Sequence, residues 1–248
     1  MRIGIRLVLI AVLLAVWEYA SGRWIDAYWV SRPSDVGLKI VEWWSSGDLL
    51  THMGITAGEA LAGFLIGTLA GGVVGFIFGW FKRVADILDP FIIAIYSLPK
   101  VALAPLFIIW FGIGFQMKVI LTAVIVFFLV FFNTYSGVRD TSRELIDIVR
   151  LMGARTEQVL RWVVLPSALT AIFVGLRVSV PYALIGAVVG EMMASNRGVG
   201  FLLMQSAGMF DTAGTFAALL VLIAISAAFN ESIRFLEGYL LRWKVVQR

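Results

Sequence analysis

Two basic residues stand inside long apolar stretches of this sequence, where they would act as fixed positive charges in a medium of low polarity. They are Lys100 and Arg177, the latter one helical turn before Pro181. A charged side chain at mid-membrane depth costs roughly 2.5 to 3.5 kcal/mol, so something must offset it. If both cations face a central cavity, they attract an anion. Alternatively, Arg177 binds carbonyls freed by Pro181 or pairs with Glu191 or Glu59, and Lys100 extends to cytoplasmic water.

Other polar side chains in the apolar stretches are further candidates for such a cavity. Ser97 lies beside Pro99 and upstream of Pro105, and prolines remove backbone hydrogen-bond donors. Irregular backbone at membrane depth is tolerated only where it is buried in protein or lines a wet cavity. Single polar groups such as Asn133 and Tyr182 also commonly just bridge helices. The candidate residues for a translocation path are therefore Ser97, Lys100, Asn133, Arg177 and Tyr182.

Covalent and metal chemistry have little support in the residue types. The sequence has no cysteine, and its single histidine, His52, lies outside the apolar stretches. A catalytic site needs a converging nucleophile, base or set of metal ligands. A nucleotide site needs a glycine-rich phosphate loop with Lys and Ser or Thr, and this pattern is also missing. We therefore predict no catalytic residues, no metal site and no cofactor bound by this chain.

A charged, amphipathic segment interrupts the apolar pattern. Apolar and charged residues interleave there at helical spacing, with opposite charges four residues apart at Arg143 and Asp147 and again at Glu157 and Arg161. Gly153 predicts a turn between two short helices, because glycine readily takes the left-handed conformation that ends a helix. The segment is either a docking element for a soluble partner or a linker that lies on the membrane.

The elements that must position these residues follow from composition. Of the 248 residues, 60% are hydrophobic and only 15% charged, and the mean hydropathy is +0.93. Soluble domains are roughly half apolar and a quarter charged. Since a helical span needs about 20 apolar residues, we predict an all-α integral membrane protein with six transmembrane helices. The predicted spans are Ile5–Ala20, Ile55–Phe81, Phe91–Phe111, Met117–Val138, Ala168–Met192 and Thr212–Leu236.

These spans divide the chain into two parts. Residues 1–54 hold the first transmembrane helix and an external loop, and residues 55–248 form a core of five transmembrane helices. The charged segment is a cytoplasmic loop, residues 139–166, between the fourth and fifth spans. Pro90 suits the start of the third span, where a missing backbone donor costs nothing.

Charge asymmetry orients the chain, since Lys and Arg accumulate in short cytoplasmic loops. With both termini in the cytoplasm, most of the basic residues lie inside. These are Arg2, Arg6, Lys82, Arg83, Arg139, Arg143, Arg150, Arg155, Arg161, Arg234, Arg242, Lys244 and Arg248. The isoelectric point near 9.6 reflects this excess of basic residues on the cytoplasmic side, where they face the anionic lipid of the inner leaflet. No motif for DNA or RNA is present, so we expect no nucleic-acid partner.

The N-terminal region leaves two alternatives open. Arg2 and Arg6 before an apolar run resemble a signal peptide. Glu18 and Tyr19 stand where small residues should precede a cleavage site, which favours an uncleaved helix. The tryptophan-rich external stretch Ser21–Gly54 favours an interfacial helix over a lid, because Trp and Tyr prefer the headgroup level.

The second span has a small residue at every fourth position. Small residues let another helix backbone approach closely in lipid, so helix packing is the favoured reading and a gating hinge the alternative. The repeated glycines are Gly63, Gly67, Gly71, Gly75 and Gly79.

The charged segment also carries a family resemblance. Gly153, nine further residues, and then Val163, Val164, Leu165 and Pro166 resemble the cytoplasmic signature of the permease subunits of bacterial ABC importers. That signature reads E-A-A, three residues, G, nine residues, I, any residue, L-P. Here Asp147, Ile148 and Val149 replace E-A-A, and Val163 replaces I, so the charge is kept but the side chains are bulkier.

Flanking segments are similar to the nitrate, sulfonate and taurine branch of these permeases. They are Leu98–Pro99 with Ala104–Leu106, Ile109–Gly114, Asn133–Tyr135 with Gly137–Arg139, Gly175–Arg177 and Gly198–Gly200.

The resemblance implies a type I importer permease that forms one half of a homodimeric pore in the bacterial cytoplasmic (inner) membrane. Two ATP-binding cassette subunits, which carry ATP and Mg, would bind beneath it, and an external solute-binding protein would deliver the solute. ATP-driven movement of the coupling loop would then produce alternating access. The residues implied in coupling to the ATPase are Arg143, Glu144, Asp147, Arg150, Gly153, Ala154 and Glu157.

The expected activity is therefore transport rather than catalysis. The solute class favoured by two intramembrane cations is a small anion such as a sulfonate, taurine or nitrate. The alternative is an ion-coupled secondary carrier, a class that commonly shows internal repeats and intramembrane acids. No repeat is visible here, and Glu59 and Glu191 lie near the predicted span ends. A scaffold bundle without transport would not explain the proline-broken third span.

Overall fold

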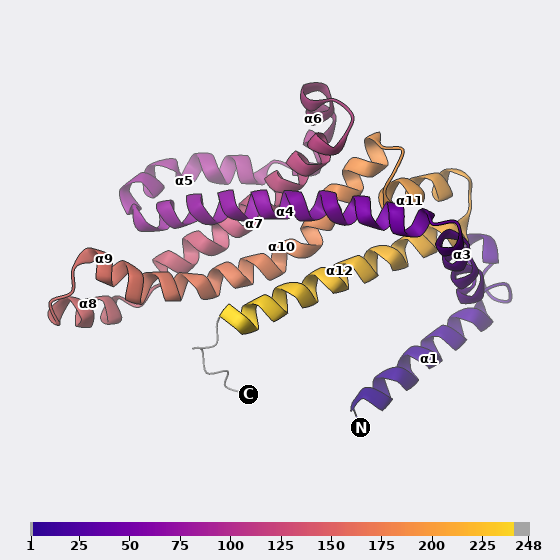
Figure 1. Ribbon diagram of the computed structural model, residues 1–248, viewed down its shortest axis with the longest axis horizontal. Coiled ribbons are helices and arrows are strands. Elements are labelled where there is room, and N and C mark those ends of the chain that lie inside the picture. Colours follow the sequence, from indigo (N-terminus) through magenta and orange to yellow (C-terminus); the bar gives the residue numbers. More distant parts are fainter. Residues whose placement is uncertain (1, 241–248) are drawn as a thin grey trace.

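The computed structural model describes residues 2–240, and within that range it is helical with no β-strand (Figure 1). The α-helices are α1 (Arg2–Ala20), α2 (Ala27–Val30), α3 (Pro33–Ser45), α4 (Asp48–Trp80), α5 (Lys82–Ser97), α6 (Ala104–Phe111), α7 (Phe115–Arg139), α8 (Arg143–Leu151), α9 (Thr156–Val159), α10 (Leu165–Ala194), α11 (Val199–Gly208) and α12 (Thr212–Leu240). A 3-10 turn, η1 (Lys100–Leu103), precedes α6, and a π-helical turn, η2 (Leu160–Val164), precedes α10.

The all-α membrane architecture expected from composition is confirmed. Within residues 2–240, four helices are long and apolar enough to cross a membrane, and a bent pair makes a fifth if it counts as one span. The four are Asp48–Trp80, Phe115–Arg139, Thr156–Ala194 and Thr212–Leu240. The first expected span lies in α1, which is not among them, so the count of six remains a prediction. Three of the basic residues used for the orientation lie outside the described residues: Arg242, Lys244 and Arg248.

The glycine repeat lets α4 and α7 pack backbone to backbone. A Cβ atom placed on Gly67 or on Gly71 would lie 2.5 Å from the carbonyl oxygen of Ala123 or of Phe127, respectively, on α7. Such contacts leave no room for a larger side chain, which confirms the packing interpretation of the repeat. The α7 helix also packs against α10, and Figure 1 shows α7 passing alongside α4.

The third expected span is broken, as its prolines predicted. The axes of the helices on either side of Leu98 and Pro99 differ by 77°. Pro90, however, does not start this span, because it lies inside α5, which begins at Lys82. A single proline removes one backbone donor, and the remaining hydrogen bonds of the helix stay in place around it.

The stretch Ser21–Gly54, expected to be external, forms α2, α3 and the start of α4, and both α2 and α3 pack on α12. Val36 and Trp43 of α3 are buried, whereas Trp44 is exposed. Lys39 of α3 lies 3.1 Å from Glu42 and 3.3 Å from Asp211, which precedes α12. The hydrogen bond that Lys39 donates to Glu42, followed by its contact with Asp211, raises the pKa of Lys39. The helical content of the stretch is thus settled, and its depth in the headgroup region remains a prediction.

Candidate coupling and translocation sites

The charged segment forms two short helices at one end of the molecule, α8 and α9, seen at the left of Figure 1. Ser142 caps α8, where its Oγ accepts the Leu145 N–H at 3.3 Å. Glu144 in the first turn and Arg150 in the last turn complement the helix dipole. The sequence therefore specifies both the start and the polarity of α8.

Gly153 makes the turn between these helices, as predicted. Its φ of +88° lies in the left-handed region, which residues with a Cβ rarely adopt. The Gly153 N–H donates to the Arg150 carbonyl at 2.9 Å, and the Ala154 N–H donates to the Val149 carbonyl at 3.2 Å. These two bonds satisfy carbonyls that the end of α8 would otherwise leave free.

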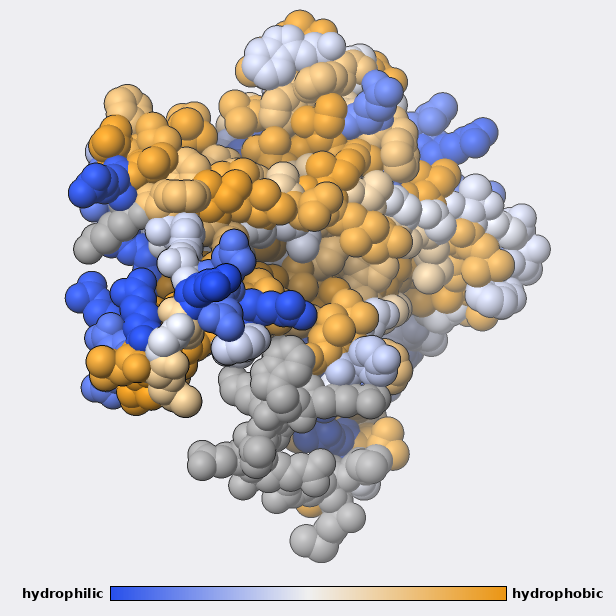
Figure 2. Space-filling view, turned by 60° about the vertical axis from the view of Figure 1, so that its left-hand side comes forward, coloured by the Kyte–Doolittle hydropathy of each residue, from blue (hydrophilic) through white to orange (hydrophobic). Residues whose placement is uncertain are grey.

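The segment has one packed face and one open face. Ile146 and Val149 pack against a buried cluster that includes Val138 and Val159. On the open face, Leu151 is 88% exposed and Met152 81% exposed. The coupling candidates Arg143, Glu144, Asp147, Arg150, Gly153 and Glu157 are exposed as well, whereas Ala154 is half-buried. Figure 2, in which this end comes forward, shows hydrophilic side chains gathered there beside hydrophobic ones.

The ion pairs expected within the segment do not form. Among the described residues, the ion pairs within 4.0 Å include neither Arg143 with Asp147 nor Glu157 with Arg161. All four side chains are exposed, and an exposed pair gains little over separate hydration in water. Their charges are consequently free to face a partner.

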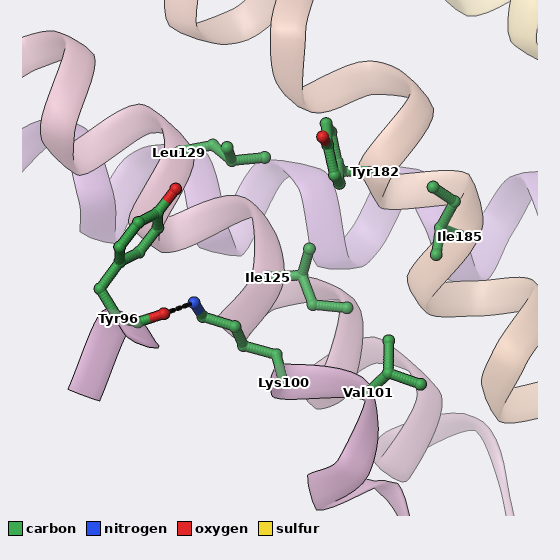
Figure 3. Close-up of a pocket in the computed structure, with 7 residues that line it drawn as sticks. All are labelled: Tyr96, Lys100, Val101, Ile125, Leu129, Tyr182 and Ile185. Carbon is green, nitrogen blue, oxygen red and sulfur yellow. Dashed lines mark hydrogen bonds between the residues drawn. The ribbon is translucent and has the colours of Figure 1, made fainter. Parts of the chain in front are cut away.

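Two of the five path candidates, Lys100 and Tyr182, line one pocket of about 220 Å³ (Figure 3). Tyr96, Lys100 and Val101 come from the broken third span, Ile125 and Leu129 from α7, and Tyr182 and Ile185 from α10. The Lys100 Nζ donates to the Tyr96 carbonyl and lies 4.0 Å from the Tyr96 ring centroid and 5.0 Å from that of Phe128. The break after Ser97 thus turns a lysine toward aromatic faces between three elements.

Asn133 and Ser97 lie outside that pocket. The Asn133 Nδ2 donates to the Leu129 carbonyl at 2.8 Å, and Asn133 lines a second pocket of about 440 Å³ that reaches Leu145 of α8. The Ser97 Oγ donates to the Ile93 carbonyl at 2.8 Å, one turn back in its own helix. The structure therefore gives Ser97 a local hydrogen bond and places Asn133 between the bundle and the coupling segment.

One of the alternatives for Arg177, an ion pair with Glu191 or Glu59, was wrong. Arg177 forms an ion pair with Glu237 of α12, not with Glu191 or Glu59. Arg177 lies near the middle of α10, opposite Glu237 in the last turn of α12, whereas Glu191 lies in the last turn of α10. The partner of Arg177 depends on how α10 packs against α12, and the sequence alone does not specify that packing.

Sequence reasoning missed a buried polar cluster at the other end of the bundle. Glu59 of α4 forms an ion pair with Lys118 of α7, and Glu191 of α10 lies beside them. The available signal was Lys118 at the edge of one span, with an acid near the end of each of two others. Which of these ends coincide is decided by the packing of α4, α7 and α10.

Comparison with known proteins identifies the family of this chain. Residues 63–244 match the family described as "Binding-protein-dependent transport system inner membrane component". The chain is 34% identical over 239 residues to an aliphatic sulfonates transport permease protein, SsuC, of Bacillus subtilis (strain 168), covering 96% of this chain and 87% of SsuC. It is 35% identical over 240 residues to the riboflavin transport system permease protein RibX of Chloroflexus aurantiacus, covering 96% and 89%.

The fold recurs in a solved structure of an amino acid ABC transporter with histidines. That structure has a TM-score of 0.61 and 16% identity, and the match covers 84% of this chain and 98% of the other. In this family the permease is not an enzyme, and ATP is hydrolysed on a separate subunit. Membership therefore implies ATPase subunits and a binding protein as partners. It does not favour an ion-coupled secondary carrier. The chain belongs to the binding-protein-dependent transport system inner membrane components, as a multi-pass inner-membrane permease subunit of an ABC importer.

Proposed function

We propose that this chain forms, with a second copy of itself, the path by which a small anion enters the cytoplasm. The favoured solutes are a sulfonate, taurine or nitrate. The observation that carries this proposal is the position of the Lys100 ammonium in a pocket between the broken third span, α7 and α10. The sulfonate permease among the relatives supports the same class of solute.

The charge of Lys100 is available to a ligand. Among the described residues, no carboxylate lies within ion-pair distance of its ammonium group, whose contacts are the Tyr96 carbonyl and two aromatic rings. A cation with only these contacts in an apolar setting is incompletely compensated. An incoming anion would compensate the charge of Lys100. A neutral solute such as riboflavin would not.

A second copy of the chain would complete the pocket. Tyr96, Leu98 and Tyr182 leave apolar surface exposed beside Lys100. In a homodimer that surface would be covered, and the two pockets would face a shared path. The other candidates would lie beside this path rather than in the pocket: Ser97, Asn133 and Arg177. Of these, Arg177 is paired with Glu237.

The coupling segment would transmit the ATPase cycle. We take the exposed face of α8, with Leu151 and Met152, as the surface that enters a cleft of each of two ATPase subunits in the cytoplasm. Closure of the ATPase pair would move α8 and rock α10 through η2, opening the path outward toward the solute-binding protein. Both termini would lie in the cytoplasm.

The test is a reconstituted transport assay. The chain, tagged and purified in gentle detergent from its native host, is expected to bring with it an ATP-binding cassette subunit at equal stoichiometry. The complex in proteoliposomes, supplied with its binding protein, is then assayed for ATP-dependent uptake of taurine, an alkanesulfonate, nitrate and riboflavin. Uptake of an anion supports the proposal. Uptake of riboflavin alone would overturn the solute class, and a lone chain without an ATPase would overturn the assembly.

A further inference from the structure

Three ionisable side chains meet in the interior where α4, α7 and α10 come together. Glu59 is 1% exposed, Glu191 1% and Lys118 4%. The Lys118 Nζ forms an ion pair with Glu59 Oε1 and donates to Ser195 Oγ at 3.1 Å. Buried charges are stable only when they are paired and hydrogen-bonded, so the state of every oxygen in this cluster matters.

Both oxygens of Glu191 accept hydrogen bonds. Thr56 Oγ1 donates to Glu191 Oε1 at 2.7 Å, and the Gly200 N–H donates to Glu191 Oε2 at 2.6 Å. Thr56 Oγ1 in turn accepts the Val199 N–H at 2.8 Å. Glu191 therefore joins α4 to the first turn of α11 and has the surroundings of an ionised carboxylate.

Glu59 is left with an oxygen that has no partner. Its Oε1 faces Lys118, but its Oε2 is buried and makes no hydrogen bond within the described residues. Two contacts bring the Glu59 and Glu191 carboxyl groups into one site: Thr56, one turn before Glu59 on α4, donates to Glu191, and Lys118, the partner of Glu59, packs so closely on Gly190 that a Cβ there would lie 2.6 Å from Lys118 Cγ. Two carboxylates held this close do not both ionise. One ammonium group also balances only one of the two negative charges.

We propose that Glu59 and Glu191 share a single proton, which lies between Glu59 Oε2 and the Glu191 carboxylate, so that the pair as a whole carries the one negative charge that Lys118 balances. This proton fills the vacant hydrogen-bonding position and makes the cluster neutral, with one carboxylate, one carboxylic acid and one ammonium. The cluster is then a clamp that ties the adjoining ends of α4, α7, α10 and α11 together. The proton sharing does not depend on which solute the protein transports.

The surroundings contain two further titratable or charged groups. The His52 Nδ1 of α4 lies 2.8 Å from the Gly198 nitrogen and 3.1 Å from the Gly198 carbonyl oxygen. Arg197, after α10, is exposed and lines the same pocket of about 670 Å³ as Glu59 and Lys118. This pocket gives the pair a route to water. Loss of the shared proton would leave two carboxylates, on α4 and α10, with only the Lys118 ammonium to balance them, and the excess negative charge would push these helices apart.

Infrared absorption of the purified full-length chain tests the proposal. At neutral pH ordinary glutamates, with a pKa of about 4.3, are ionised. We expect the wild-type chain to show the carbonyl band of a protonated carboxyl group. The band should disappear in Glu59→Gln and in Glu191→Gln, because the remaining carboxylate then pairs with Lys118. Glu42→Gln, which changes an exposed carboxylate of α3, is the matched control and should leave the band unchanged.

Lys118→Met provides a second test in the opposite direction. Without the ammonium, neutrality requires both carboxyls to be protonated, so the band should about double. A wild-type chain without the band, or a band that survives both glutamine substitutions, would overturn the proposal. If circular dichroism shows that the glutamine variants do not fold, the wild-type spectrum and Lys118→Met decide, and a Lys118→Met band no larger than that of the wild type counts against it.

Discussion

Two side chains of the same charge, Lys100 and Arg177, have different surroundings in this molecule. Lys100 lies in a pocket against aromatic rings, and no described carboxylate is within ion-pair distance of it. Arg177 is paired with Glu237 and is half-exposed. A charge that is already paired has little left to offer a solute, so transport of an anion should depend on Lys100 far more than on Arg177.

Replacement of Lys100 tests this difference. Lys100→Met keeps the length of the side chain and removes its charge, so we expect uptake of the anion to fall about tenfold, the equivalent of one hydrogen bond to a charged group. The measurement is initial uptake rate in proteoliposomes. Lys100→Arg should retain most of the rate, and Arg177→Ala is the comparison that should change it least. Normal uptake by Lys100→Met would show that the Lys100 ammonium of the wild-type chain does not act on the solute and only contacts Tyr96 and Phe128.

At the level of elements, two devices shape the fold. The glycine repeat brings α4 into backbone contact with α7, and Gly153 turns α8 into α9. The first device stabilises the bundle by close helix packing. The second presents an exposed helix with unpaired charges. Substitutions in them should therefore affect different properties, stability for the repeat and partner binding for α8.

The packing device is tested by adding one methyl group. In Gly67→Ala the new Cβ would meet the Ala123 carbonyl oxygen at 2.5 Å, so we expect the helices to separate at a cost of about 1 to 3 kcal/mol. Thermal unfolding in detergent measures the change. Gly58→Ala, in the same helix, adds a Cβ with nothing within 4 Å and should leave the melting temperature nearly unchanged. Equal stability of the two variants would contradict close packing at Gly67.

The coupling role of α8 is tested by reversing one charge. Asp147 is exposed and has no ion-pair partner among the described residues. We expect Asp147→Arg to abolish copurification of the ATPase subunit while the chain keeps its helical content. The control is Glu231→Arg, at an exposed position of α12. Retained ATPase binding by Asp147→Arg would remove Asp147 from the docking surface.

For the molecule as a whole, the main expectation is orientation. The coupling segment and the α2–α3 region lie at opposite ends of the long axis (Figure 1). If the bundle crosses the membrane along that axis, one end faces the cytoplasm and the other faces the solute-binding protein. The excess of basic residues near the coupling end favours the cytoplasm there.

Single cysteines test the orientation directly, because the chain contains no cysteine of its own. Leu151→Cys, on α8, and Trp24→Cys, between α1 and α2, both replace well-exposed side chains. A membrane-impermeant maleimide should label Trp24→Cys in right-side-out vesicles and Leu151→Cys only in inverted ones. The opposite labelling pattern would reverse the topology.

Local patterns in the sequence were enough to predict the helical membrane architecture, the break at Pro99, the turn at Gly153 and the close packing of the glycine repeat. Each of these depends on local properties, namely hydrophobic length, a missing backbone donor, a left-handed φ or the size of a side chain. Only the tertiary structure decided that Arg177 meets Glu237 and that Glu59, Lys118 and Glu191 share one buried site. Those partners are distant in sequence, and their meeting depends on the register and rotation of packed helices, which no local pattern encodes.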